Sequence, residues 1–152
     1  MEVYLMKRLF LPLLGLVPFL CGWLVNELIL KPSPLGHLGY AVGFLVLWFL
    51  LAYGFSRLVK SIPWAMVLLH LPAAVVLLLL GVQELILHAY WLNPVGLWTQ
   101  FFYLPLINLA TRLFPWSDRM LWIYCTSFLL LLATALLGCL ARRHRASRQK
   151  QS

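Results

Sequence analysis

Four long apolar runs constrain this chain more than any other feature of its sequence. They cover roughly residues 9–30, 38–55, 64–90 and 120–141. A helix needs about 20 apolar residues to cross the roughly 30 Å of hydrocarbon in a bilayer. Inside lipid, every backbone polar group must be hydrogen-bonded within the spanning structure. The sequence therefore predicts an all-α polytopic membrane protein, a bundle of four transmembrane helices in a single domain over residues 1–141.

The composition excludes a soluble domain. Of the 152 residues, 63% are hydrophobic and only 11% are charged, whereas about a quarter of the residues in a soluble domain are charged. Too few polar side chains are present to cover a surface that faces water. We therefore expect an integral membrane protein whose first partner is the lipid bilayer itself.

The segment 93–116 is the hardest to assign. It is apolar and nearly long enough to span a membrane, but Pro105 interrupts it. On a helical wheel, Gln100, Asn108, Thr111 and Arg112 fall within about 120° of one another, which is an amphipathic pattern. Its many aromatic residues suit the headgroup region. We expect an amphipathic or re-entrant interfacial segment before the last helix, and the alternative is a fifth span.

The distribution of Lys and Arg favours four spans over five. With four spans and a cytoplasmic N-terminus, nine basic residues lie inside and three outside, whereas five spans give six on each side. Cytoplasmic loops carry the excess of positive charge in membrane proteins. We therefore expect both termini in the cytoplasm, and the short basic loops favour a bacterial plasma membrane.

The chain ends in a basic segment, residues 142–152, which we expect to be a disordered cytoplasmic tail. Its cations are Arg142, Arg143, Arg145, Arg148 and Lys150. Basic residues directly after a span orient the protein and attract anionic lipids, at about 1 kcal/mol for each Lys or Arg near the surface. This position favours a role in topology and lipid binding over binding to nucleic acid.

Small residues mark the faces on which the helices are expected to pack. In lipid, helix association depends on close contact between backbones, so glycine stripes indicate contacts. The candidate packing residues are Gly15, Gly22, Gly39, Gly43, Gly81 and Gly138, and Gly39 and Gly43 form a GxxxG motif. The stripes predict a packed bundle, but the packing can be within one chain or between copies.

Polar side chains interrupt the third apolar run on one face. His70, Gly81, Glu84 and His88 lie within about 80° on a helical wheel. An ionisable group inside a span is costly and usually has a function or a partner. His70, Glu84 and His88 are therefore a candidate transport path along this helix face.

Several ionisable residues are also expected near the outer side of the membrane. The candidate outer-face cluster consists of Glu27, His37, Glu84 and His88. His37, His88 and Glu84 are weak candidates for metal ligands, because imidazole and carboxylate suit zinc-like ions but no HExxH motif supports them. A structural alternative is that Glu84 and His88 pair with each other, with Asn26 or Lys31, or with lipid headgroups.

No enzymatic motif accompanies these residues. The chain has neither a GxSxG nucleophile motif nor a glycine-rich phosphate loop, and no cofactor is predicted. We expect a non-enzymatic subunit or accessory factor that binds another membrane protein or a second copy of itself. One alternative is a small dimeric carrier or channel that uses Glu84, His70 and His88. Another is an outer-face enzyme that acts on a lipid or lipid-linked substrate through the candidate cluster.

Overall fold

The computed structural model describes residues 10–29, 36–56, 61–116 and 118–149. Within them the chain forms five helices: α2 (Val17–Ile29), α3 (His37–Phe55), α4 (Ile62–Leu85), α5 (Pro94–Leu113) and α6 (Met120–Arg148). A short helical segment over residues 10–14 precedes α2. The predicted all-α fold is confirmed. Lys31 and Lys150, to which the sequence assigns possible roles, lie outside the described residues.

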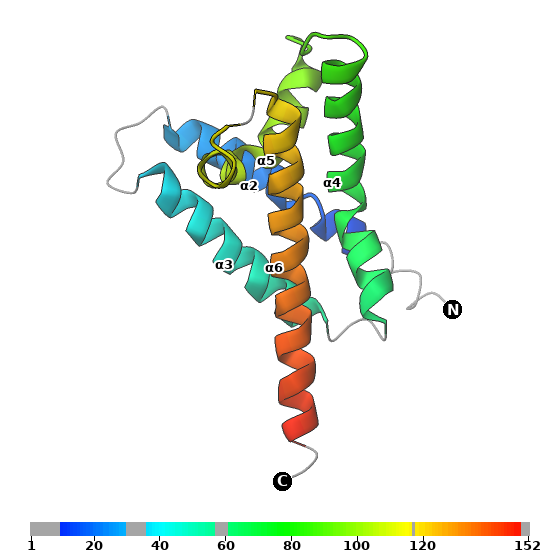
Figure 1. Ribbon diagram of the computed structural model, residues 1–152. Helices are drawn as coiled ribbons and strands as arrows, with labels where there is room; N and C mark the ends of the chain where they lie inside the picture. Colours follow the sequence, from blue (N-terminus) through cyan, green and yellow to red (C-terminus); the bar gives the residue numbers. More distant parts are fainter. Residues whose placement is uncertain (1–9, 30–35, 57–60, 117, 150–152) are drawn as a thin grey trace.

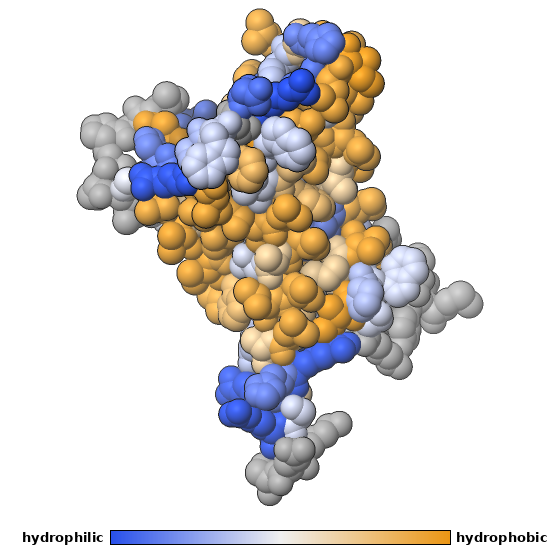
Figure 2. Space-filling model, in the orientation of Figure 1, coloured by the Kyte–Doolittle hydropathy of each residue, from blue (hydrophilic) through white to orange (hydrophobic). Residues whose placement is uncertain are grey.

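Four stretches are long and apolar enough to cross a membrane. They are Phe10–Ile29, His37–Phe55, Ile62–Leu85 and Met120–Arg148, which agrees with the four predicted spans. Figure 2 shows a broad apolar surface around the middle of the molecule, with hydrophilic residues towards its two ends. The chain is a small polytopic membrane protein.

The helices do not all run in parallel. Figure 1 shows α4 and α6 running from the top towards the bottom of the view, α3 crossing α6 obliquely, and the end of α5 seen almost end-on. The helix α6 contacts α3, α4 and α5, whereas α2 packs chiefly against α5. The helix α5 therefore connects α2 to the rest of the bundle.

One face of α5 is deeply buried. Tyr103, Leu106 and Ala110 are at most 1% exposed, and the helix contacts α2, α3, α4 and α6. A helix that lay on the membrane surface alone would bury its apolar face in lipid rather than against four other helices. The predicted aromatic segment before the last span is thus an integral part of the helical bundle.

A glycine and a proline account for the close contact between α2 and α5. Pro105 has no N–H, so the carbonyl of Phe101, four residues earlier, lacks its helical donor. Gly22 packs directly against this carbonyl: a Cβ atom at Gly22 would lie 1.7 Å from the Phe101 oxygen. Contacts between Cα–H groups and carbonyl oxygens recur where helices approach this closely. Only glycine fits here, because the neighbouring atom belongs to the backbone.

At the contact between α3 and α6, a glycine again packs against a backbone carbonyl, and a buried hydrogen bond joins the two helices. A Cβ atom at Gly138 would lie 2.7 Å from the Phe49 carbonyl oxygen and 3.1 Å from the Ala52 Cβ. Further along the pair, the indole N–H of Trp48 donates to the Leu131 carbonyl at 3.0 Å. Both contacts fix how α3 lies along α6.

The remaining candidate packing glycines differ in their surroundings. Gly15 packs against the Leu69 carbonyl of α4, and a Cβ at Gly81 would meet Leu121 at an ordinary 3.8 Å. Gly43 has open space around it, and Gly39 is exposed. Within one chain, the GxxxG motif of α3 therefore faces away from its neighbours.

Two expected boundaries are wrong. The third helix ends at Leu85 rather than near Tyr90, because tertiary hydrogen bonds hold the following residues in a loop. The expected disordered tail is helical as far as Arg148. No proline or glycine follows Gly138 to stop α6, and basic residues near a helix C-terminus complement its negative dipole end.

Candidate functional site

The strongest candidate site is the junction at which α4 ends and α6 begins. Oε2 of Glu84 accepts a hydrogen bond from the hydroxyl of Tyr90. The same oxygen accepts a second bond from the backbone N–H of Leu121, at 2.7 Å. Leu121 lies in the first turn of α6, where the backbone N–H groups have no partner within the helix. Glu84 therefore caps α6 from a neighbouring helix, and its negative charge faces the positive end of the α6 dipole.

Gln83, the residue before Glu84, holds the other side of this junction. Its side chain is fully buried, and Oε1 accepts a hydrogen bond from the backbone N–H of Trp91 at 3.0 Å. Its Nε2 has no hydrogen-bond partner in the described part of the chain. The Gln83 carbonyl also accepts from the N–H of Ala89, at 3.1 Å. Two adjacent polar side chains thus hold the loop after α4 against the bundle.

Tyrosine rings surround this polar junction. The rings of Tyr90 and Tyr124 have centroids 6.5 Å apart, and those of Tyr124 and Tyr103 have centroids 5.8 Å apart. The Tyr103 hydroxyl donates to the Ala73 carbonyl at 2.6 Å, which ties α5 to α4. Burial raises the pKa of Tyr90, and the hydrogen bond to Glu84 and the charge of Glu84 raise it further. Tyr90 therefore stays protonated and serves as a donor.

His88 does not join Glu84. It lies in the loop beyond α4, is exposed, and has a φ angle of 50°, a conformation in which His is several-fold enriched among non-glycine residues. No hydrogen bond or ion pair in the described part of the chain connects it to Glu84. Among the described residues, the hydrogen-bond partners of Glu84 are Tyr90 and the backbone of Leu121 instead of the predicted His88 or Asn26.

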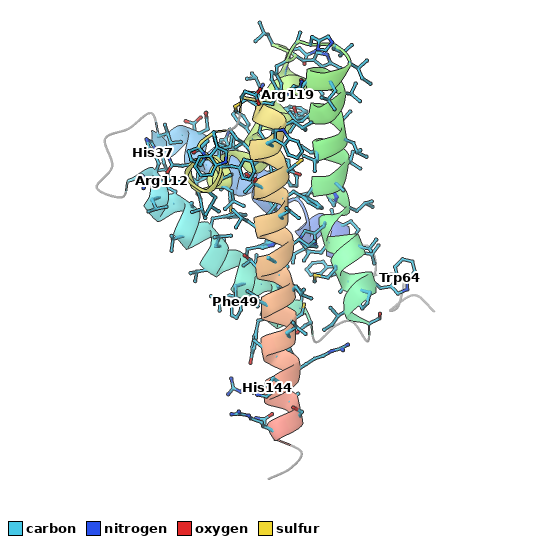
Figure 3. All side chains as sticks on the ribbon, viewed as in Figure 1. His37, Phe49, Trp64, Arg112, Arg119 and His144 are labelled. Carbon is cyan, nitrogen blue, oxygen red and sulfur yellow. The ribbon has the colours of Figure 1, made fainter. Side chains whose placement is uncertain are left out.

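The other two members of the candidate outer-face cluster lie on different elements. Glu27 is an exposed residue of α2, and His37 is the exposed first residue of α3. In Figure 3, His37 is on the side of α6 away from α4, which carries Glu84. Among the described residues, no three His, Cys, Asp or Glu side chains form a group that could hold a metal ion.

His70 lies in the interior of the bundle, far from Glu84. It is 4% exposed and sits edge-on to the rings of Trp48 and Phe128, with centroids 6.0 and 6.1 Å away. Nδ1 is 2.9 Å from the Met66 carbonyl oxygen, and Nε2 has no partner in the residues described. Fourteen helical residues, about 21 Å of rise, separate His70 from Glu84. The two residues share a helix face, and within the described residues no hydrogen bond links them.

Sequence reasoning found Glu84 but missed the groups that bind it. Tyr90 is six residues away and Leu121 is 37 residues away, so neither has helical spacing to Glu84. A short polar residue before each apolar run would have been the usual capping signal, but here the cap comes from another helix. The arrangement can orient helix ends.

Comparison with known proteins gives no match: no protein-family model, no curated protein and no solved structure is similar to this chain.

Proposed function

We propose that this membrane protein is a non-enzymatic subunit or accessory factor of a larger membrane assembly. The observation that carries the proposal is the structural role of Glu84, the carboxylate that interrupts the third apolar run of the sequence. Its two hydrogen bonds join α4, the following loop and α6. A group that holds the fold together in this way is poorly placed to bind and release a substrate or an ion.

Large apolar side chains are exposed in the loop after α4, on α5, after α5 and at the start of α6. We call five of them together the aromatic surface: Leu92, Trp98, Phe114, Trp116 and Trp122. Trp116 is 80% exposed and Leu92 is 93% exposed. Tryptophan is enriched both in membrane-interface belts and in the energetically dominant parts of protein interfaces. The proposal assigns these residues to contact with another membrane protein on the outer side of a bacterial plasma membrane, with both termini cytoplasmic.

The proposal predicts that the aromatic surface is required for binding to the partner. Native mass spectrometry of the tagged full chain, extracted in mild detergent, should detect a second protein in fixed stoichiometry. The double change Trp98→Ala and Trp116→Ala should remove that protein and leave the helical content unchanged. Trp64→Ala is the matched control, because Trp64 is 65% exposed and lies on α4 away from this surface (Figure 3). It should leave the complex intact.

Two results would contradict the accessory proposal. If the wild-type chain forms a homodimer with no other protein, and Glu84→Gln abolishes transport while the dimer persists, the carrier or channel is the better function. If an enzymatic turnover of a lipid-linked substrate depends on His37, which contributes no packing, the outer-face enzyme is the better function.

A further inference from the structure

The C-terminal part of α6 extends beyond the apolar bundle. At 29 residues, α6 is about 44 Å long, whereas the hydrocarbon of a bilayer is about 30 Å thick and the bilayer with its headgroups about 40–45 Å. In Figure 1 its last turns project past the other helices, and Figure 2 shows a hydrophilic surface directly below the apolar one. A helix that spans the hydrocarbon therefore places its final turns at the level of the lipid headgroups.

Tyr53, near the end of α3, holds two of the arginines in this extension. Nη1 of Arg142 donates to the Tyr53 carbonyl at 3.3 Å, and the guanidinium carbon lies 5.7 Å from the centre of the Tyr53 ring. Nη1 of Arg145 donates to the Tyr53 hydroxyl at 3.4 Å. Arg142 and Arg145 are three residues apart and therefore neighbours on one helix face. The tyrosine fixes two guanidinium groups beside each other.

This arrangement leaves several donors unused in the described part of the chain. The Tyr53 hydroxyl accepts a bond from Arg145, so its own hydrogen is available to a further acceptor. Each guanidinium group has five N–H donors, of which one is used here. No carboxylate among the described residues forms an ion pair with either arginine. An anion with several acceptor oxygens would complete the hydrogen bonding.

We propose that Tyr53, Arg142 and Arg145 form a binding site for the phosphate group of an anionic phospholipid. Arginine binds phosphate through paired, charge-assisted hydrogen bonds, and the Tyr53 hydroxyl adds a third donor. Exposed apolar residues also occur earlier along both helices, including Leu50 on α3 and Leu137 on α6, which are 58% and 60% exposed. These residues offer a surface for acyl chains, which a free phosphate ion would not need.

The proposal is tested by titrating lipids into the full-length protein in a neutral detergent and counting bound molecules by native mass spectrometry. Phosphatidylglycerol and phosphatidylcholine with identical acyl chains are the two probes. We expect phosphatidylglycerol to bind several-fold more tightly. Arg145→Gln should weaken its binding about fivefold, the equivalent of about 1 kcal/mol for one cation near the surface.

Two further variants separate a built site from diffuse charge. Tyr53→Phe leaves the net charge unchanged and should still weaken phosphatidylglycerol binding, because it removes one donor. Arg148→Gln removes the same charge as Arg145→Gln at a residue with no contact to Tyr53, and should weaken binding less. Circular dichroism and tryptophan fluorescence report whether each variant keeps its fold.

Three results would overturn the proposal. Equal affinity for the two lipids would remove the phosphate preference. Equal losses in Arg145→Gln and Arg148→Gln, with none in Tyr53→Phe, would mean that charge alone attracts the lipid. Displacement of phosphatidylglycerol by millimolar inorganic phosphate would identify a site for the free ion instead of a lipid.

Discussion

At the scale of single residues, Glu84 links three segments through one carboxylate oxygen. A hydrogen bond to a charged group contributes about 1.5–3 kcal/mol to stability, so Glu84→Ala should destabilise the protein by about that amount. Glu84→Gln should destabilise the protein less, because the amide oxygen can still accept a hydrogen bond from the Leu121 N–H. The measurement is unfolding of the purified protein by increasing mole fractions of sodium dodecyl sulfate, followed by circular dichroism.

His88→Ala is the control for this prediction. His88 is exposed and forms no hydrogen bond with Glu84 within the described residues, so its removal should leave stability unchanged. A loss as large as that of Glu84→Ala would mean that the two residues act as a pair.

The bond between Tyr90 and Glu84 also makes a prediction about pH. The pKa of Tyr90 in the folded protein is raised by burial, then by the hydrogen bond and the charge of Glu84. A raised folded pKa means that the stabilisation is complete below the ordinary tyrosine pKa of about 10. It is lost as the pH rises above that value through the folded pKa. Stability should therefore stay constant from neutral to mildly alkaline pH.

Replacement of Glu84 should move this titration. In Glu84→Gln, the pKa of Tyr90 should fall towards its ordinary value, although burial keeps it somewhat higher. Phenolate absorbance during alkaline titration measures the change, and Tyr90→Phe identifies the part of the signal that belongs to Tyr90. If Glu84→Gln leaves the titration of Tyr90 unchanged, the carboxylate does not govern it.

Prediction from the sequence succeeded for residues that are identified by the free-energy cost of placing a charged group in the membrane. A carboxylate in an apolar run is expensive, so Glu84 stands out without any structure. Its partners depend on how the chain turns after Leu85, and no proline or glycine marks that turn. Gln83 was not singled out as a buried group for the same reason: its burial depends on the loop that folds over it.

At the scale of helices, the glycines divide into those at close contacts and those on open faces. Gly22→Ala would place a methyl group 1.7 Å from the Phe101 carbonyl oxygen, so α2 and α5 must separate. Overpacking of this kind costs about 1–3 kcal/mol, and the backbone neighbour cannot rotate away. We expect Gly22→Ala to lower the resistance to sodium dodecyl sulfate and to loosen α2, as seen by faster proteolysis between α2 and α3.

Gly43→Ala is the matched control, because a Cβ at Gly43 meets nothing within 4 Å. Alanine is favoured over glycine in a helix by about 1 kcal/mol, so this variant should be as stable as the wild type or slightly more stable. A destabilised Gly43→Ala monomer would contradict the open face. Dimer loss without monomer destabilisation would instead place a second copy on α3.

The helices were predicted from the lengths of the apolar runs. The prediction failed where the end of a run does not coincide with the end of the helix. The second span was predicted at 38–55 and is observed at His37–Phe55, because turn residues precede it and basic residues follow it. The third span lacks such markers at its end, and the basic residues after the fourth predicted span lie within the helix instead of ending it. Helix α4 ends early through tertiary hydrogen bonds, and α6 continues through arginines that suit a helix. Pro105 interrupted the pattern of α5 but not the helix itself.

At the scale of the whole molecule, the charged ends of the apolar bundle decide how it crosses the membrane. Four arginines lie in the last turns of α6, whereas Arg112 and Arg119 are near its start (Figure 3). The excess at the α6 C-terminus favours a cytoplasmic position for that end. This orientation requires that α5 not cross the membrane. The hydrogen bond between Glu84 at the end of α4 and Leu121 at the start of α6 agrees with it, because it holds both helix ends at the same end of the bundle.

Labelling of two exposed positions distinguishes four crossings from five. In a variant with its cysteines replaced by alanine, Leu92→Cys tests the loop after α4 and Ser147→Cys tests the end of α6; both sites are exposed. With four spans, a membrane-impermeant maleimide should label Leu92→Cys in intact cells, and Ser147→Cys only after the membrane is opened. With five spans, α5 returns the chain to the cytoplasm and α6 crosses outward, so both sites should be labelled in intact cells. That result would place Tyr53, at the end of the second span, and the α6 arginines on opposite sides of the membrane, which would contradict the Tyr53 site.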